Sequence, residues 1–402
     1  MQQIVQDILF GTPQPRRSIV NLGVLFIDKV NVIIHGHEPI LSEMIVEASE
    51  DSELLKLAKE IGAAGINVAG ICCTGNENLM CHGTPIIRTF LQQELAVITG
   101  AVEAMVVDVQ CIMPSLGDLA GCYHTKFIST LPKADFPGTV RMEFHEDRAY
   151  ETAKKIVRIA VENFSSRNPK KVNIPNEKQE CMVGFSAEAT LSALGGSPDP
   201  LIEAIKNGTV GGVGAVVGCN NVKIKHNYRH VNLVKELIKN NVLVVTTGCN
   251  AIACAEAGLL VPGAPGSAGD ELKVVCEALG ISPVLHMGSC VDISRILLLS
   301  SILASRLGVD ISDLPAAAAA PEWMSEKAVS IGVYVVASGV LVVLGTVPPI
   351  LGSQAVTALL TNGLTNVVGA RFAVEPDPIK AAHLMLEHID GKRRSLGLNS
   401  VR

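Results

Sequence analysis

Short aliphatic runs alternate with longer amphipathic segments along almost the whole chain, and this rhythm constrains the fold more than any other feature. The runs predicted to be strands are 30–34, 66–71, 105–109, 126–130, 212–217, 242–247, 284–287, 341–344 and 367–372. Helical patterns lie between them, at 41–61, 149–164, 230–239, 291–307 and 379–388. Strand, crossover helix and strand in this order form parallel sheets with right-handed connections. The sequence therefore predicts an α/β fold.

One polar stretch, 167–180 (RNPKKVNIPNEKQE), interrupts this alternation and contains two prolines. Polar segments of this kind are typical of domain boundaries. The 402 residues provide core volume for two domains. We therefore predict a first α/β domain over 1–170 and a second, larger one over 171–402.

Composition excludes several classes of partner. Hydrophobic residues make up 48% of the chain and charged residues 18%, which is typical of parallel sheets buried on both faces. The net charge is −6 and there is no long basic block, so we expect neither nucleic acid nor an anionic membrane as partner. Residues 1–17 lack the pattern of a secretory signal, which predicts a cytoplasmic location.

The segment 331–351 is apolar over about the length of a membrane span. Ser338 and Gly339 divide it into a helical part and a β-branched part, and Pro348 stops the second part. We therefore predict a helix followed by a strand in a soluble core, with no membrane span.

Cysteines follow five of the predicted strands. The chain has eleven cysteines, and disulfides are not expected in a reducing compartment. The five that follow strands are Cys73, Cys111, Cys219, Cys249 and Cys290. His37 similarly follows the first strand. Binding sites of doubly wound sheets form at the carboxyl ends of the strands, so these six side chains are candidate ligands.

Thiolates together with imidazole select zinc, nickel or iron in sulfide clusters. Structural zinc normally uses four closely paired ligands, so six dispersed ones favour a multi-metal cluster between the two domains. A single nucleophilic cysteine would leave the other four unexplained, and no phosphate-binding glycine motif accompanies a strand. The other cysteines that we interpret as structural thiols are Cys81, Cys122, Cys181, Cys254 and Cys276.

At these residues the chain resembles the catalytic part of the nickel-dependent anaerobic carbon monoxide dehydrogenases, in the prismane and hybrid cluster protein superfamily. The resemblance rests on motifs in the family's order: HGHEP (35–39), GICCTGNE (70–77), DVQCIMP (108–114), FSAEA (185–189), VGCNN (217–221), TTGC (246–249), LHMGSCVD (285–292) and MSEKA (324–328). It implies two Rossmann-like, three-layer α/β/α domains. It also implies oxidation of CO with water to CO2, two protons and two electrons, at a nickel-iron-sulfur cluster.

The resemblance further implies a role for each candidate ligand. Cys290 would bind nickel, and His37 with Cys73 would bind the iron outside the cubane. The remaining irons would be bound by Cys111, Cys219 and Cys249. The choice of His37 over His35 follows the family pattern alone.

Two further residues match the family's pocket. Lys327 matches the lysine that hydrogen-bonds the carboxylate formed in the reaction, and Ile331 would be a wall of the same pocket. Without the resemblance, Lys327 would be interpreted as a surface lysine at the start of a helix.

The first cysteine of the chain is Cys72. Family members of the usual length carry a preceding helical domain with two further iron-sulfur clusters, so a short form without that electron relay is expected. A ferredoxin-like or separate iron-sulfur protein would then take the electrons, and a homodimer is expected from the family. The alternatives are a hybrid-cluster reductase similar to hydroxylamine reductases, and a metal-cluster scaffold without catalysis.

Cys72 and Cys73 are adjacent, and successive side chains of an extended strand point to opposite faces. Cys73 lies 38 residues before Cys111 (111 − 73), which is the spacing of the family pattern. We therefore expect Cys73 to be the ligand and Cys72 to pack beneath the sheet or behind the ligands.

Overall fold

The computed structural model describes residues 2–264 and 267–399, which form two compact units, Met1–Glu180 and Cys181–Arg402. The predicted boundary at residue 170 lies earlier than the observed one. Residues after it still pack on the first unit, because the amide of Asn173 donates to the carbonyl of Thr99 at 2.8 Å. The amide of Gly23 likewise donates to the carbonyl of Glu177 at 3.0 Å.

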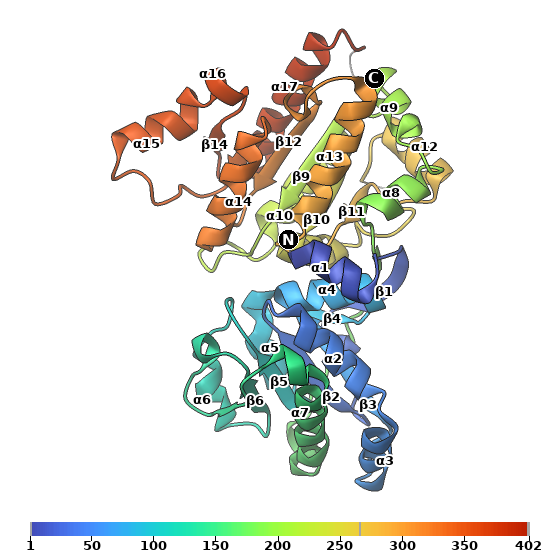
Figure 1. Ribbon diagram of the computed structural model, residues 1–402, viewed down its shortest axis with the longest axis vertical. Helices are drawn as coiled ribbons and strands as arrows, with labels where there is room; N and C mark the ends of the chain where they lie inside the picture. The colour runs from blue at the N-terminus through green and yellow to red at the C-terminus, as the bar shows by residue number, and fades with distance from the viewer. Residues whose placement is uncertain (1, 265–266, 400–402) are drawn as a thin grey trace. The chain divides into compact units, whose positions relative to one another are not determined.

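The first unit contains β1 to β7 of a sheet with the order β7-β6-β5-β2-β3-β4-β1-β8 (Figure 1), and β8 crosses the boundary at residue 180. The strands are β1 (Arg16–Val20), β2 (Val30–His35), β3 (Ile66–Ile71), β4 (Ile86–Arg88), β5 (Ala104–Val107), β6 (Lys126–Ser129), β7 (Thr139–Arg141) and β8 (Gln179–Val183). The pairs from β1 through β7 are parallel. Six of these strands follow the order of a Rossmann fold, in which the chain reverses direction across the sheet between β2 and β5.

The first unit has seven α-helices among its described residues. They are α1 (Gln2–Phe10), α2 (Pro39–Ser49), α3 (Ser52–Glu60), α4 (Cys72–His82), α5 (Gln93–Ile98), α6 (Leu116–Ala120) and α7 (Ala149–Asn163). One core joins Ile45 of α2 and Ile156 of α7 to Val32 of β2, all fully buried. Burial of these aliphatic side chains holds α2 and α7 on one face of the sheet.

The second unit repeats this topology. Its six-stranded parallel sheet has the order β11-β10-β9-β12-β13-β14, again that of a Rossmann fold. The strands are β9 (Gly212–Val217), β10 (Val242–Thr247), β11 (Val284–His286), β12 (Ala316–Ala320), β13 (Leu341–Leu344) and β14 (Phe372–Val374). The reversal of strand order therefore falls between β9 and β12.

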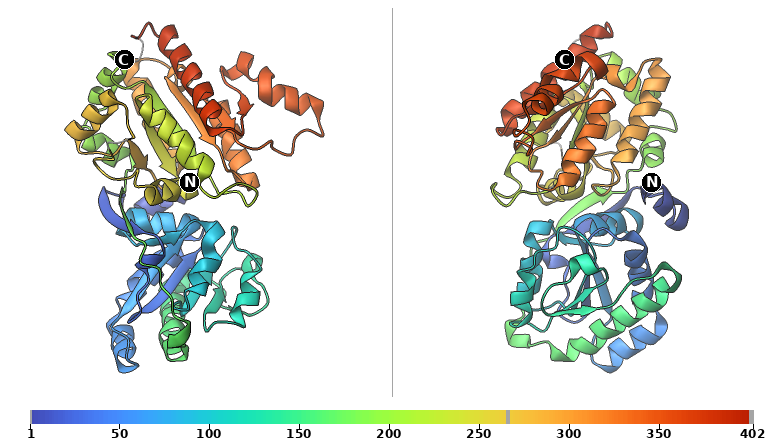
Figure 2. Two further views of the ribbon diagram at one scale, coloured as in Figure 1. Left: turned by 180° about the vertical axis from the view of Figure 1, so that it is seen from behind. Right: turned by 60° about the vertical axis from the view of Figure 1, so that its left-hand side comes forward.

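The second unit has ten α-helices in the part of it that the structure describes. They are α8 (Ala187–Ala193), α9 (Asp199–Lys206), α10 (Tyr228–Lys239), α11 (Gly248–Glu256), α12 (Asp270–Leu279), α13 (Ile293–Leu307), α14 (Glu326–Ala337), α15 (Gln354–Ala358), α16 (Thr365–Val368) and α17 (Pro378–Ser395). Figure 1 shows α13 and α14 over one face, and the view from behind in Figure 2 shows α10 and α17 over the other. The predicted α/β/α layering is confirmed here.

Three predicted elements were wrong. The alanine run 316–320, expected to be a loop or helical turn, is strand β12, because its small side chains fit between β9 and β13 and tertiary packing outweighs the helix propensity of alanine. The helix predicted over 41–61 is split, since Asp51 accepts the amide of Glu53 and starts α3. The strand predicted over 367–372 begins only at Phe372, after α16 has ended at Gly369 with φ of +73°.

The apolar segment 331–351 divides as predicted. Helix α14 ends at Ala337, Gly339 has φ of +85°, and β13 begins at Leu341. Within residues 2–264 and 267–399, none of the helices combines the length and the apolar character needed to cross a bilayer.

Candidate metal centre

In the first unit, one histidine and two cysteines converge at the carboxyl ends of the central strands. The ligand atoms of His37, Cys72 and Cys111 all lie within 4.8 Å of one another. His37 follows β2, Cys72 follows β3 and Cys111 follows β5, so the reversal of strand order brings them together. An imidazole with two thiols is a donor set for a soft or borderline metal.

A backbone carbonyl and a buried carboxylate orient His37 as a ligand. Its Nδ1 donates to the carbonyl oxygen of Val109 at 2.7 Å, and Nε2 lies 4.0 Å from the sulfur of Cys72. The carboxylate of Asp108 accepts the amides of His37 (2.6 Å) and Glu38 (3.0 Å). A metal-binding histidine usually donates its other ring N–H in this way, so Nε2 is the nitrogen presented to a metal.

The backbone at this centre is strained. Cys72, Gln110 and Cys111 have φ of +65°, +59° and +58°, in the left-handed region that non-glycine residues rarely adopt. Gly36, beside His37, has φ of +148°, and a Cβ there would lie 2.0 Å from Oδ1 of Asp108. Strain of this kind persists where the surrounding structure enforces it, often at functional sites.

Cys111 has the chemistry of a ligand. Hydrogen bonding from Cys72 lowers the pKa of its thiol, although burial opposes this change. A lowered pKa favours the thiolate, which is the form that binds metals.

The prediction for the cysteine pair differs from the structure. Strand β3 ends at Ile71, and both cysteines belong to the first turn of α4 instead of an extended strand. The left-handed backbone of Cys72 turns its sulfur toward His37, so it does not pack beneath the sheet as expected. Cys73 is buried and lies close enough to Cys111 to raise the pKa of that thiol. Both thiols of the pair therefore belong to this region, with Cys72 in the converging group.

His35 lies behind the centre. Its Nε2 is 3.2 Å from Oε1 of Gln93 and 3.1 Å from the carbonyl oxygen of Cys111. Complete burial lowers its pKa to about 4, which keeps the ring neutral. His37 is the histidine that the structure places with the thiols.

In the second unit, three buried cysteines follow the three neighbouring strands β9, β10 and β11. They are Cys219, Cys249 and Cys290. Gly248 sits at the start of α11 with φ of +65°, and a Cβ on it would lie 2.4 Å from the sulfur of Cys290. The loops that carry Cys249 and Cys290 therefore approach each other as closely as a glycine allows.

A buried ion pair shapes the loop of Cys290. Oδ2 of Asp292 accepts the amide of Ser289 at 2.7 Å and lies 3.4 Å from a guanidinium nitrogen of Arg295. That guanidinium also donates to the carbonyl of Met287 at 3.3 Å. The loop is therefore held on both sides of the cysteine.

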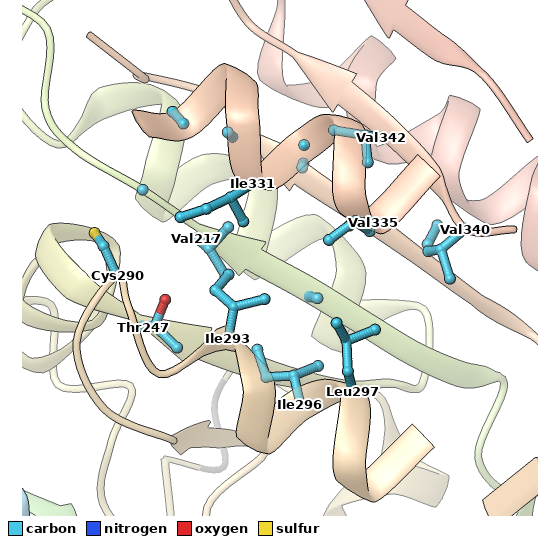
Figure 3. Close-up of a pocket in the computed structure, with 18 of the residues that line it drawn as sticks. Val217, Thr247, Cys290, Ile293, Ile296, Leu297, Ile331, Val335, Val340 and Val342 are labelled. Carbon is cyan, nitrogen blue, oxygen red and sulfur yellow. The ribbon is translucent and has the colours of Figure 1, made fainter. Parts of the chain in front are cut away.

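An apolar cavity of about 70 Å³ extends from these thiols between α13, α14 and the sheet. Cys219, Cys290, Lys327 and Ile331 are among its lining residues. In the close-up of Figure 3, Cys290 and Thr247 lie at one end, and aliphatic side chains of both helices and of the sheet line the rest. The cavity suits a small uncharged molecule.

The cysteines interpreted as structural have matching surroundings. Burial raises the pKa of both Cys254 and Cys276 to about 12, so these thiols stay protonated. Cys181 is buried, Cys81 is half-buried and Cys122 is exposed. None of these five is in the group around His37.

Sequence reasoning missed the residues that orient the ligands. Asp108 and Gln93 in the first unit and Asp292 and Arg295 in the second hold the ligand loops. Asp108 and Asp292 stand inside the motifs DVQC and SCVD, three and two residues from a cysteine, and that proximity was the available signal. Nothing in the pattern around Gln93 indicated its contact with the loop of Cys111.

Residues 1–379 match the model of the Prismane/CO dehydrogenase family. The chain belongs to this family. It is 81% identical over 395 residues to carbon monoxide dehydrogenase 1 of Methanosarcina mazei, covering 98% of this chain and 63% of that protein. It is 46% identical over 409 residues to carbon monoxide dehydrogenase 1 of Carboxydothermus hydrogenoformans, covering 98% and 64%.

Solved structures of the family share the fold. A nickel-free carbon monoxide dehydrogenase from Thermococcus sp. AM4 superposes with a TM-score of 0.96 at 57% identity, covering 99% of this chain and 63% of that one. An acetyl-CoA synthase/carbon monoxide dehydrogenase described with NiZn[Fe4S4] and NiNi[Fe4S4] clusters gives 0.94 at 44% identity, covering 98% and 60%. The chain thus spans less than two thirds of the length of these relatives.

Proposed function

We propose that the protein oxidises CO with water to CO2, two protons and two electrons, reversibly, at a nickel-iron-sulfur cluster. The observation that carries this proposal is the set of histidine and cysteine donors at the strand ends of a chain from the Prismane/CO dehydrogenase family. When bound, the cluster would supply the site of substrate binding and accept the two electrons.

The residues present fit such a cluster. The proposed ligands are His37, Cys73, Cys111, Cys219, Cys249 and Cys290, with Cys72 as a further thiol beside His37. Thiolate sulfurs and a neutral imidazole are the donors that iron-sulfur and nickel sites use. The lowered pKa of Cys111 and the oriented Nε2 of His37 support ligand roles for both.

The chain's own contribution to the chemistry would come from Lys327 and the cavity. The apolar walls, Ile331 among them, admit a small uncharged molecule and exclude bulk water. The ammonium of Lys327, which also lines the cavity, would donate to the oxygen on which negative charge develops as carboxylate forms. A fixed cation there stabilises the transition state more than the uncharged substrate.

The two electrons require an acceptor. We propose a ferredoxin-like or separate iron-sulfur protein as the acceptor, and a homodimer as the assembly, from membership of the Prismane/CO dehydrogenase family. These proposals concern partners and rest on the family alone.

The test is metal analysis after anaerobic purification, combined with CO-dependent dye reduction by the same sample. We expect nickel and iron in the wild type, and CO oxidation. The Cys290→Ala variant should lose nickel and activity and remain soluble, whereas Cys254→Ala, whose thiol is fully buried away from the ligands, should keep both.

Other outcomes would overturn the proposal. Activity that survives Cys290→Ala would refute the site assignment. Iron without nickel, with reduction of hydroxylamine, would indicate a hybrid-cluster reductase. Nickel and iron with no turnover would indicate a scaffold. Alanine variants at Cys72 and Cys73, compared for iron content, would show which thiol of the pair binds metal.

A further inference from the structure

A buried polar cluster joins the loop of Cys219 to the loop that carries Lys327. Its centre is Glu322, which is fully buried and follows β12, while Cys219 follows the neighbouring strand β9. The two loops leave the sheet where the strand order reverses. Hydrogen bonds that fix the position of one loop relative to the other therefore also fix Lys327 relative to the thiol of Cys219.

Each oxygen of Glu322 holds a different partner. Oε1 accepts the amide of Arg229 at 2.9 Å and that of His230 at 3.4 Å, at the start of α10. Asn227, the N-cap residue of α10, makes no side-chain cap hydrogen bond. The carboxylate thus takes the place of a cap, where negative charge is favoured.

The other oxygen faces the cysteine loop. Oε2 accepts the side-chain amide of Asn220 at 2.9 Å, and Asn220 directly follows Cys219. His230, held by Glu322 through its backbone, donates from Nε2 to the carbonyl oxygen of Cys219 at 2.9 Å. Asn220, His230 and Glu322 are each 0% exposed, so these bonds are not exchanged with water.

The connection continues toward the lysine. Nδ2 of Asn221 donates to the carbonyl oxygen of Trp323 at 3.0 Å, and the indole of Trp323 donates to the carbonyl of Thr346 at 2.9 Å. The hydroxyl of Ser325 lies 3.9 Å from the sulfur of Cys219, two residues before Lys327. Contacts between the two loops therefore run from Glu322 to the start of α14.

We propose that Glu322 is a positioning residue that fixes the Lys327 ammonium relative to the Cys219 thiol. This inference rests on the proposed function for its catalytic consequence, because there the lysine stabilises charge beside the cluster. The geometric part stands on the hydrogen bonds alone. Displacement of the Lys327 ammonium would lower the rate of CO oxidation sharply, because electrostatic stabilisation of the transition state depends on pre-organised geometry.

The test uses Glu322→Gln, which preserves shape but turns an N–H₂ group toward the N–H₂ group of Asn220. The matched control is Glu236→Gln, also in the second unit, where the carboxylate contacts Asn240 and His383 instead of the cysteine loop. We expect hydrogen exchange in residues 219–221 and 322–327 to rise at least about tenfold in Glu322→Gln, as loss of a charged buried hydrogen bond predicts. Exchange in β10 and in the control should not change.

Two further readouts separate positioning from simple destabilisation. The alkylation rate of Cys219 in metal-free protein should change in Glu322→Gln, and kcat for CO should fall at least about tenfold at unchanged nickel and iron content. The double variant Glu322→Gln with Asn220→Asp restores the donor-acceptor pair between these two positions, because the new amide can donate to the new carboxylate, but it loses the hydrogen bond from Asn220 to Oδ1 of Asn227. It should recover part of the exchange protection and of kcat.

The outcomes are distinguishable. Unchanged exchange and alkylation in Glu322→Gln would refute the positioning role, whatever the activity. Changed exchange that the double variant does not reverse would also refute it, because the pairing with Asn220 would then not be responsible. If wild type does not oxidise CO, the proposed function fails, while exchange and alkylation still decide whether Glu322 couples the two loops.

Discussion

Arg167→Ala removes one partner of a buried ion pair in the first unit. The guanidinium donates from Nε and from one terminal nitrogen to Glu103, at 2.8 and 2.7 Å. The side chains of Arg167 and Glu103 are 6% and 0% exposed. The same guanidinium donates to the carbonyls of Ile27, Lys29 and Ala101, and it lies 4.5 Å from the ring of Phe164.

The expected cost follows from what the substitution leaves behind. Glu103 keeps the amide of Asn31 at 2.7 Å and Nε2 of His124 at 2.9 Å, but it loses its cation, and three backbone carbonyls lose a donor. Breaking a buried pair in this way destabilises by about 3–5 kcal/mol. That corresponds to a roughly 150- to 5,000-fold larger population of the opened unit.

The assay is native-state hydrogen exchange of peptides that cover β2 and β5, because exchange reports opening of one unit in a chain with two. The matched control is Arg158→Ala. Its ion pair with Glu53 has side chains that are 40% and 63% exposed, so we expect about 1 kcal/mol or less.

Two results would contradict this reasoning. Exchange that rises less than about tenfold in Arg167→Ala would show that the pair is not a major support of the first unit. Equal effects of the two substitutions would show that burial does not decide the cost. The contacts lie at the amino ends of β2 and β5, so metal content should stay unchanged in both variants.

Gly248→Ala should lower nickel content, because its Cβ would lie 2.4 Å from the sulfur of Cys290, whereas Gly280→Ala, with the same φ of +65° and no atom within 4 Å, should not. Equal metal content in the two variants would contradict crowding as the cause. For pH dependence, the hydrogen bond to Glu43 raises the pKa of His82 above 6.5. The stability from this pair is complete below about pH 6.5 and is lost as pH rises through the higher folded pKa. Urea unfolding across this range should show a fall that His82→Asn abolishes, and parallel curves would refute the linkage.

Much of the fold could be predicted because it depends on local patterns. The runs 66–71, 212–217, 242–247 and 341–344 coincide with β3, β9, β10 and β13, since short runs of mostly aliphatic residues form the interior strands of parallel sheets. The alanines of β12 carried no such pattern. Alanine favours a helix, and only the neighbouring strands β9 and β13 make that run a strand.

Very short strands were also beyond prediction. β4 (Ile86–Arg88) and β7 (Thr139–Arg141) have three residues each, too few to show a period. Their existence depends on pairing with partners far away in the sequence.

The candidate site was also predictable only in the part that depends on local pattern. The alternation of elements predicts parallel strands whose carboxyl ends lie on one side of the sheet. The sequence by itself therefore determined that five candidate ligands would follow those carboxyl ends, namely His37, Cys111, Cys219, Cys249 and Cys290.

Tertiary structure alone decided which atoms meet. The pair at 72–73 was interpreted through the geometry of an extended strand, but a left-handed turn at the start of α4 directs the sulfur of Cys72 to His37. Likewise, no spacing links Glu322 to Asn220, which lies 102 residues away. Local pattern determines most of the secondary structure, whereas contacts between loops depend on the order of the strands in the sheet, and that order is a property of the folded chain.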